Sequence, residues 1–355
     1  MTISRCTALL PFLLLLTVPV HAQSQPTPAK ASAAPPLRRW LEIESFTVFS
    51  RYRFTDDSRD VTTANQLQYK DQIQARVNLD AARRYSVHVG FFSGGSFIGT
   101  WNNWGVGHGT SFDGRDNYVK QLYASAAPID GMELQYGGLY LNRGEADEWV
   151  TYDTDGYIAG ERVSVRRPKD LYLDEITITR AALGPFDTPS LFRRWDGLAH
   201  PNYTQVLARK RFSRLLGGSL EYDRQLGADL LRAAITVHLP ATSPVSAVRW
   251  EQYRRFNRHA ASGVGVWAER SITKHLQLQA GYVTVDRFYG GWNADRMQSG
   301  RHLFAAATIP IHGPFTASIY AARALSTPYA VPIGRRFDAV IGYDVRDALR
   351  RTGIF

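Results

Sequence analysis

Residues 66–79, QLQYKDQIQARVNL, alternate between polar and apolar side chains along almost their whole length. The polar positions begin at Gln66 and recur at every second residue to Asn78, with Lys70 and Arg76 among them; the positions between them are apolar except for Asp71. Successive side chains of a β-strand point to opposite faces, so this stretch predicts a strand with one wet face and one apolar face. Strands that cross a bilayer in a barrel wall show this pattern over about 10 residues.

The same period of two recurs from Trp40 onward, with little sign of amphipathic helix. We expect about 16 strands, and counts of 14 to 18 are compatible with the weaker stretches. The expected strands lie near residues 41–54, 66–79, 85–98, 117–127, 131–141, 156–167, 171–183, 202–213, 217–224, 229–239, 247–256, 263–271, 275–287, 301–310, 314–325 and 335–345.

The connections between these strands alternate in length. The short ones include residues 80–84, 128–130, 168–170, 214–216, 272–274 and 311–313. The long ones include residues 55–65, 99–116, 142–155, 184–201, 288–300 and 326–334. Outer-membrane barrels combine short periplasmic turns with long extracellular loops, and closure satisfies every backbone group in the bilayer. The sequence therefore predicts an all-β fold, a closed antiparallel transmembrane β-barrel with its short turns in the periplasm.

The N-terminal segment predicts export. Arg5 precedes a nearly unbroken apolar run over residues 8–20, and Val20-His21-Ala22 has the small-x-small pattern of a cleavage site. We expect residues 1–22 to be a signal peptide, residues 23–39 a flexible periplasmic lead-in, and residues 40–355 the barrel. The single cysteine, Cys6, lies in the signal segment, so the mature chain is expected to have no disulfide and no cysteine-based metal site.

Residues 132–179 carry the most distinctive motifs. GGL at residues 137–139 ends one expected strand, NRGE at 142–145 begins an acidic loop, and GER at 160–162 lies in the next strand. This succession resembles the bacterial outer-membrane porin superfamily, which includes general, anion-selective and alginate-export-like porins. In porins the loop after the fifth strand folds into the barrel and narrows the channel, and residues 142–155 correspond to that loop. Porins usually end on a strand whose last residue is Phe; Phe355 is terminal here, but the alternation stops at Val345.

Two groups of charged residues are candidates for the channel lining. The first contains basic residues that alternation places on the wet face, which are Lys70, Arg76, Arg162, Arg166, Arg209, Arg211, Arg232 and Arg254. The second contains the carboxylates of the expected constriction loop, which are Glu145, Asp147, Glu148, Asp153 and Asp155. A lumen lined by one sign of charge concentrates the opposite ion, so we hypothesise an anion preference. The alternatives are arginines that face headgroups or pair with carboxylates, and a loop that is merely solvated.

The expected function is an outer-membrane porin of a Gram-negative bacterium, a water-filled channel for passive diffusion of small hydrophilic solutes, anions among them. The chain lacks the local motifs of common enzymes and any metal-ligand spacing, so no catalytic residue, metal or cofactor is expected. The expected partners are outer-membrane lipid, the barrel-assembly machinery and, as one alternative, two more copies of the chain in a homotrimer; nucleic acid is not expected. The rival functions are a barrel hydrolase, an adhesin and a soluble exported β-protein.

Overall fold

The computed structural model describes residues 40–94, 101–108, 117–147, 149–150, 156–166, 172–184, 190–273, 276–287, 296–297, 299–326 and 333–352. In this part of the chain, strands joined by antiparallel pairing form a single sheet. The strands are β1 (Leu41–Asp56), β2 (Thr62–Asn78), β3 (Tyr85–Ser93), β4 (Asn102–His108), β5 (Asn117–Ala126), β6 (Met132–Tyr140), β7 (Tyr157–Val165), β8 (Glu175–Ala182), β9 (Tyr203–Arg211), β10 (Leu216–Gln225), β11 (Ala228–His238), β12 (Ala247–Arg255), β13 (Ala261–Thr273), β14 (Leu276–Val285), β15 (Gly300–His312), β16 (Phe315–Ser326) and β17 (Arg335–Asp344).

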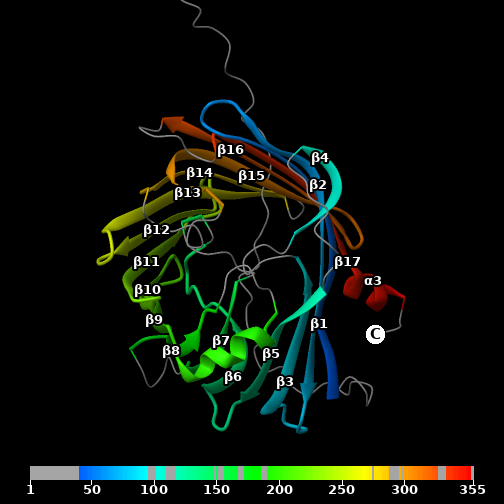
Figure 1. Cartoon of the computed structure of the whole chain (residues 1–355), viewed down its shortest axis with the longest axis vertical. Coiled ribbons are helices and arrows are strands. Elements are labelled where there is room, and N and C mark those ends of the chain that lie inside the picture. Colours follow the sequence, from blue (N-terminus) through cyan, green and yellow to red (C-terminus); the bar gives the residue numbers. More distant parts are fainter. Residues whose placement is uncertain are drawn as a thin grey trace, which may run out of the picture.

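The sheet closes on itself, because β1 pairs with β2 on one side and with β17 on the other. The barrel has 16 strands, since β4 pairs only with β2 and lies beyond the end of β3. Figure 1 shows the strands surrounding a common interior. Closure leaves no free sheet edge around the wall, as a barrel in a bilayer requires. The structure thus confirms the expected fold class and the strand number of 16.

Each of the 16 barrel strands coincides with an expected one, with ends that differ by a few residues. The largest difference lies at the first connection, where residues 55–65 were expected to form a long loop. Strands β1 and β2 instead extend to Asp56 and Thr62, and the side chains of Thr55 and Thr63 share a hydrogen bond of 2.8 Å near this end. The segment at residues 99–116 was expected to be a loop, but it contains β4.

The two ends of the barrel differ. One end, which we call the turn end, carries the connections at residues 79–84, 127–131, 212–215 and 239–246. The other, which we call the loop end, carries those at residues 94–116, 141–156, 183–202 and 286–299. The expected alternation of short and long connections is therefore present, although residues 226–227 and 256–260 are short connections at the loop end.

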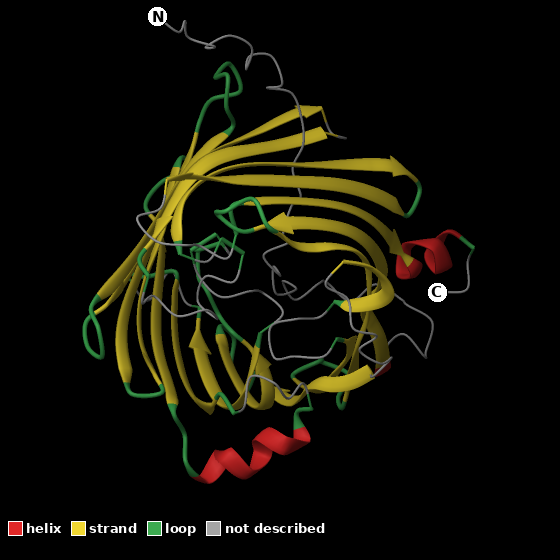
Figure 2. Cartoon of the chain, turned by 45° about the horizontal axis from the view of Figure 1, so that its top comes forward, coloured by secondary structure: helices red, strands yellow, loops and turns green. Residues whose placement is uncertain are grey.

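Two short helical segments, which the sequence pattern did not reveal, lie outside the barrel wall (Figure 2). The first consists of α2 (Phe192–Trp195) and the 3-10 helix η1 (Asp196–Ala199), and Leu191 before it packs against Gly138 of β6. The second is α3 (Val345–Arg351), which follows β17 and contacts β1. The last strand therefore ends at Asp344, and Phe355 lies outside the described residues. Among those residues, no helix is long and apolar enough to span a membrane.

Candidate pore and its constriction

The inner face of the barrel follows from strand alternation. In β2 the polar row is turned inward, since Gln68, Lys70 and Gln74 are buried while Leu67 and Val77 are exposed on the outer face. This is the arrangement expected from the sequence of residues 66–79. Polar side chains on the inner face and apolar ones on the outer face suit a barrel with water inside and lipid outside.

The segment that follows β6 crosses the interior of the barrel. Gln205 of β9 donates to the carbonyl of Asn142 over 2.5 Å, and Ser219 of β10 accepts from the amide of Glu145 at 2.9 Å. Further along, Glu251 of β12 accepts from the amide of Asp147 at 2.7 Å. Three successive contacts therefore lead this segment from β9 across β10 to β12. Because β4 is not part of the barrel, β6 is the fifth barrel strand, so this is the connection that the resemblance indicated.

The tip of this segment is fixed in an apolar cluster on the inner wall. Trp149 is only 3% exposed, and its ring lies 4.0 Å from that of Phe304 and 5.6 Å from that of Tyr320, measured between centroids. Trp267 meets the same ring edge-on, with centroids 6.5 Å apart. The cluster continues over the inner faces of β11 to β16. Toward the loop end, this side of the interior is therefore a packed core, whereas nearer the turn end the same strands turn Thr236, Arg249 and Glu269 inward.

Glu251 holds the crossing segment through both of its carboxylate oxygens. One oxygen accepts from Asp147 and the other accepts from the amide of Val150 at 2.8 Å. Glu251 is 1% exposed, so both hydrogen bonds are shielded from water. Leaving a buried amide without its acceptor costs about 1–3 kcal/mol.

Replacing Glu251 by leucine is expected to loosen residues 142–150 without opening the barrel. The two amides lose about 2–6 kcal/mol of anchoring together, so their hydrogen exchange is expected to accelerate by about 30-fold or more. Exchange followed by mass spectrometry measures this. Glu269→Gln is the control, because Glu269 bonds to Trp267 and Gln279 but not to the loop. Unchanged exchange at Asp147 and Val150 would show that Glu251 does not hold them.

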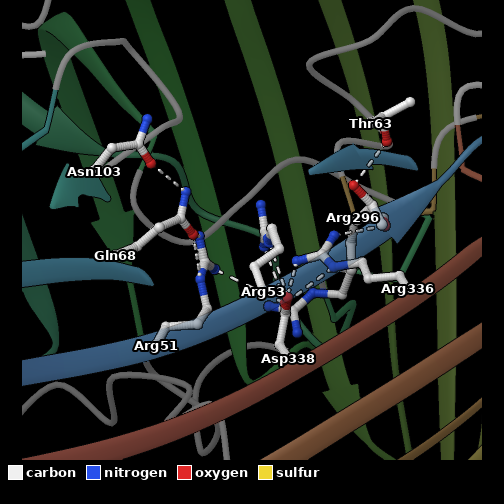
Figure 3. A network of polar contacts seen from close by, with 9 residues as sticks. Arg51, Arg53, Thr63, Gln68, Asn103, Arg296, Arg336 and Asp338 are labelled. Carbon is white, nitrogen blue, oxygen red and sulfur yellow. Dashed lines mark hydrogen bonds and ion pairs between the residues drawn. The ribbon is translucent and has the colours of Figure 1, made fainter. Parts of the chain in front are cut away.

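Beside this core lies a basic cluster, defined as Arg51, Arg53 and Arg336 at the seam where β1 meets β17 and Arg296 from the connection before β15 (Figure 3). Asp338 accepts from Arg53 at 2.8 and 3.0 Å and from Arg336 at 2.7 and 3.0 Å. Arg51 lies 3.9 Å from the same carboxylate. Three guanidinium groups, those of Arg51, Arg53 and Arg336, therefore gather around the carboxylate of Asp338.

The other contacts of the basic cluster hold it against the wall. Arg51 donates to Gln68 over 2.8 Å and lies 3.8 Å above the ring of Trp101. Arg336 donates to the carbonyl of Arg296 over 2.9 Å, and Arg296 lies 5.0 Å above the Trp149 ring. Burial and the charge of Arg336 lower the pKa of Arg296, a loop residue, to about 10, so it stays protonated at neutral pH. The basic cluster therefore reaches from the barrel seam to the tip of the crossing segment.

Three of the candidate residues from the sequence come together in a second network. Arg166 lies 3.1 Å from Glu133 and 3.4 Å from Glu175, and Arg209 lies 3.0 Å from Glu175 and 3.8 Å from Glu145. Glu145 thus joins the crossing segment to the wall formed by β6 to β9. Sequence reasoning missed Glu133 and Glu175, although both occupy the inward alternation positions of their strands.

Other candidates are buried in the wall or lie at its edge. Arg162 is 6% exposed and donates to Thr179 over 3.1 Å, whereas Lys70 is 8% exposed, with its ammonium 5.9 Å from the Trp101 ring. Arg76 donates to the carbonyl of Arg83 at the turn end. Arg211 is exposed where β9 ends.

The remaining candidates divide as follows. Asp147 meets Glu251 through its backbone, and Glu148, Asp153 and Asp155 lie outside the described residues. The expectation for Arg254 was wrong. Glu251 and Tyr253 point inward on β12, so Arg254, the residue after Tyr253, points outward and is exposed.

Arg232 is balanced by two carboxylates. Its guanidinium bonds to Glu221 at 2.5 Å and to Asp223, and all three side chains are at most 2% exposed. Removing one partner from a buried ion pair costs about 3–5 kcal/mol, because the remaining charge has no compensation. The charge of Arg232 is thus neutralised where it lies.

Arg232→Met is therefore expected to destabilise the barrel by about 3–5 kcal/mol. The temperature at which the folded band converts to the unfolded band on a gel measures the loss. The variant that also carries Glu221→Gln and Asp223→Asn should recover most of it, since neutral residues need no counter-charge. If Arg232→Met alone is as stable as the wild type, the two carboxylates do not depend on Arg232. Arg211→Met, which changes an exposed arginine, is the control.

The comparisons with known proteins concern the fold. No known family model matches the chain, and no curated protein sequence matches it significantly. Among solved structures, the chain is similar to OmpF of Salmonella typhi, from a complex with daunomycin, with a TM-score of 0.56, 12% identity and coverage of 85% of this chain and 97% of that one. A mutant of the Rh. blastica porin gives a TM-score of 0.56 at 8% identity, covering 86% and 99%. OccAB1 of Acinetobacter baumannii gives 0.54 at 10% identity, covering 84% and 95%.

These likenesses span nearly the full length of the compared chains. At such low identity they establish the fold and not the activity. The chain therefore has the fold of the bacterial outer-membrane porins, as its resemblance to that superfamily implied. The described residues contain no group of three or more side chains that could hold a metal ion.

Proposed function

We propose that this chain is an outer-membrane channel through which small hydrophilic solutes diffuse passively. The observation that carries the proposal is the segment at residues 142–150, which crosses a 16-stranded barrel and is fixed there by Ser219, Glu251 and an aromatic cluster. A barrel of this size encloses an aqueous channel unless something fills it. A segment held along the inner wall narrows such a channel without sealing it, which sets a size limit for the solutes.

The proposed path runs beside the basic cluster rather than through the centre. The apolar cluster around Trp149 occupies the wall of β11 to β16, which leaves the polar wall of β1, β2 and β17 for water and solutes. Three guanidinium groups around Asp338 give this wall a local excess of positive charge. Positive charge at a constriction concentrates anions, so we propose an anion preference.

The proposal extends to the rest of the chain. Residues 1–22 would direct export and be removed, residues 23–39 would lead into the barrel from the periplasm, and the barrel-assembly machinery would insert it into the outer membrane. The charged residues that the sequence suggested as channel lining would line the pore wherever their side chains contact water. A homotrimer is one assembly compatible with the fold.

Liposome swelling tests the channel. Purified barrel in vesicles loaded with a large polysaccharide is expected to admit arabinose and glucose rapidly and a tetrasaccharide slowly. The same chain unfolded by heat before reconstitution is the control. Swelling no faster than in empty vesicles would contradict the proposal and leave a barrel hydrolase or an adhesin as the function to test.

A further inference from the structure

Two residues of the connection between β14 and β15 lie inside the barrel. Arg296 and Met297 belong to the loop-end connection at residues 286–299. Met297 is 0% exposed and is part of the apolar cluster that contains Trp149 and Tyr320. The hydroxyl of Tyr320 donates to the sulfur of Met297 over 3.2 Å. Connecting segments usually run over the surface of a protein, so the inward position of these two residues needs an explanation.

Arg296 contacts the tip of the crossing segment. Its guanidinium carbon lies 5.0 Å from the centre of the Trp149 ring and 5.6 Å from the centre of the Tyr320 ring. Those two rings are themselves stacked, with 5.6 Å between their centroids. A cation within about 6 Å of an aromatic face is attracted by the ring, and the attraction grows where water is excluded. Trp149 is 3% exposed, so water competes little for this contact.

Arg296 is joined to the basic wall through its backbone. Arg336 of β17 donates to the carbonyl of Arg296 over 2.9 Å, and the guanidinium carbon of Arg336 lies 5.2 Å from the centre of the Tyr320 ring. Asp338 in turn accepts from Arg336 at 2.7 Å. The part of this series from Asp338 to Arg296 can be followed in Figure 3. A continuous series of contacts therefore joins Asp338 at the barrel seam to Trp149 on the crossing segment.

Arg53 offers a comparison within the same cluster. It donates to the carboxylate of Asp338 at 2.8 and 3.0 Å from the neighbouring strand β1. Among the described residues, the side-chain hydrogen bonds of Arg53 go to Asp338 alone, whereas those of Arg336 continue to Arg296. The two arginines thus carry the same charge beside the same carboxylate, but only Arg336 is bonded to a residue that contacts Trp149.

We propose that Arg296 is a positioning residue that couples the basic cluster to the crossing segment. Its guanidinium packs on Trp149, and its backbone is held by Arg336, so a change in the basic cluster alters how firmly the crossing segment is held. Chains of packed side chains and hydrogen bonds carry such coupling between separate parts of a protein. The inference rests on the proposed channel and deepens it, because one group of charges then affects both the ion preference and the width of the channel.

Hydrogen exchange at the amides of Asp147 and Val150, followed by mass spectrometry on the folded chain in detergent micelles, tests the coupling. Arg296→Gln is expected to accelerate this exchange by about tenfold, which corresponds to about 1.4 kcal/mol and lies within the range for a cation over aromatic rings. Arg296→Lys, which retains a cation at the rings, should stay within about threefold of the wild type.

A pair of matched variants then tests the link to the basic cluster. Arg336→Met removes the bond to the carbonyl of Arg296 and is expected to accelerate exchange at Val150 by about fivefold, since part of the hold on Arg296 remains. Arg53→Met removes an equal charge from the same carboxylate and should change this exchange by less than about twofold. Equal acceleration in the two variants would overturn the inference.

A double-mutant cycle decides the route of the effect. In the Arg296→Gln background, Arg336→Met should change exchange at Val150 by less than about twofold, because the contact through which it acts is already lost. An undiminished fivefold effect in that background would show that Arg336 acts on the crossing segment without Arg296, and the proposal would fail.

Two further points keep the result interpretable. Exchange is measured whether or not the barrel conducts, so failure of the coupling and failure of the proposed channel can be told apart. Heat-modifiable migration on a gel verifies that each variant is folded. If Arg336→Met does not fold, the comparison of Arg296→Gln with Arg296→Lys decides, and equal acceleration in both would show that the cation over Trp149 does not hold the crossing segment.

Discussion

Single channels formed by the Trp149→Ala variant are expected to conduct more current than those of the wild type. The indole stacks on Phe304 and Tyr320 and is 3% exposed, so its loss removes the apolar anchor of residues 142–150. Truncating a buried tryptophan to alanine costs about 3–5 kcal/mol. That is enough to move the segment from a fixed to a mobile state, which widens the channel on average and makes the open current noisier.

Planar-bilayer recordings under symmetric salt measure this effect. Trp250→Ala is the matched control, because Trp250 lies on β12 beside Glu251 and so points outward. The control should conduct as the wild type does. Combining Trp149→Ala with Glu251→Leu should add little further conductance, since both changes release the same segment. Equal conductance in Trp149→Ala and wild type would remove this segment from the conduction path.

The second large effect is expected in ion selectivity. Changing Arg51 and Arg53 to glutamine removes two charges from the basic cluster, while Arg336 still pairs with Asp338 at 2.7 Å. A unit charge about 7 Å from an ion in water changes the energy of the ion by about 0.6 kcal/mol, with opposite sign for anions and cations. Two such charges change the relative energy of an anion and a cation by about 2.4 kcal/mol, and salt at physiological ionic strength screens this to roughly half. The double variant is therefore expected to reduce the ratio of anion to cation permeability by roughly tenfold.

Reversal potentials across a salt gradient give this ratio directly. The wild type should favour chloride over potassium, and the double variant should approach equal permeability or favour potassium. Arg270→Gln, which removes a charge from the outer wall, should leave the reversal potential unchanged. A cation-selective wild type would contradict the proposed anion preference while leaving the channel itself intact.

The sequence predicted the barrel wall well because alternation is a local property. A strand between water and lipid must change polarity at every residue, as residues 66–79 do, so each of the 16 strands can be found without knowledge of its neighbours. β4, α2 and α3 have no such constraint. β4 exists because Asn65 and Gln68 of β2 offer pairing partners beyond the end of β3, a tertiary condition that its own seven residues do not reveal.

The candidate site was predicted less completely. The crossing segment could be located by counting strands, but its anchors, Ser219 and Glu251, come from β10 and β12, far along the chain. The basic cluster was missed although Arg51 and Arg53 share one face of β1, and Arg336 and Asp338 share one face of β17. Closure makes the first and last strands neighbours, so the inward residues of the two chain ends should be considered together in any predicted barrel.

The charged candidates also show what alternation leaves open. It turns Arg232 inward, but it does not show that Glu221 and Asp223 neutralise its charge. Alternation also requires knowing which of the two sets of residues faces inward, and a strand with a weak pattern does not show this. In β12 we assigned Arg254 to the wrong face. An inward arginine attracts passing anions only if no neighbouring carboxylate neutralises its charge. Those neighbours are known only once the strands are placed side by side.

Current through the purified chain in a planar bilayer tests the central claim most directly. The proposed channel predicts discrete, uniform current steps in potassium chloride, and larger steps when residues 145–153 are deleted. Protein shown to be folded by heat-modifiable migration, yet giving no steps, would contradict the claim that this barrel is an open channel.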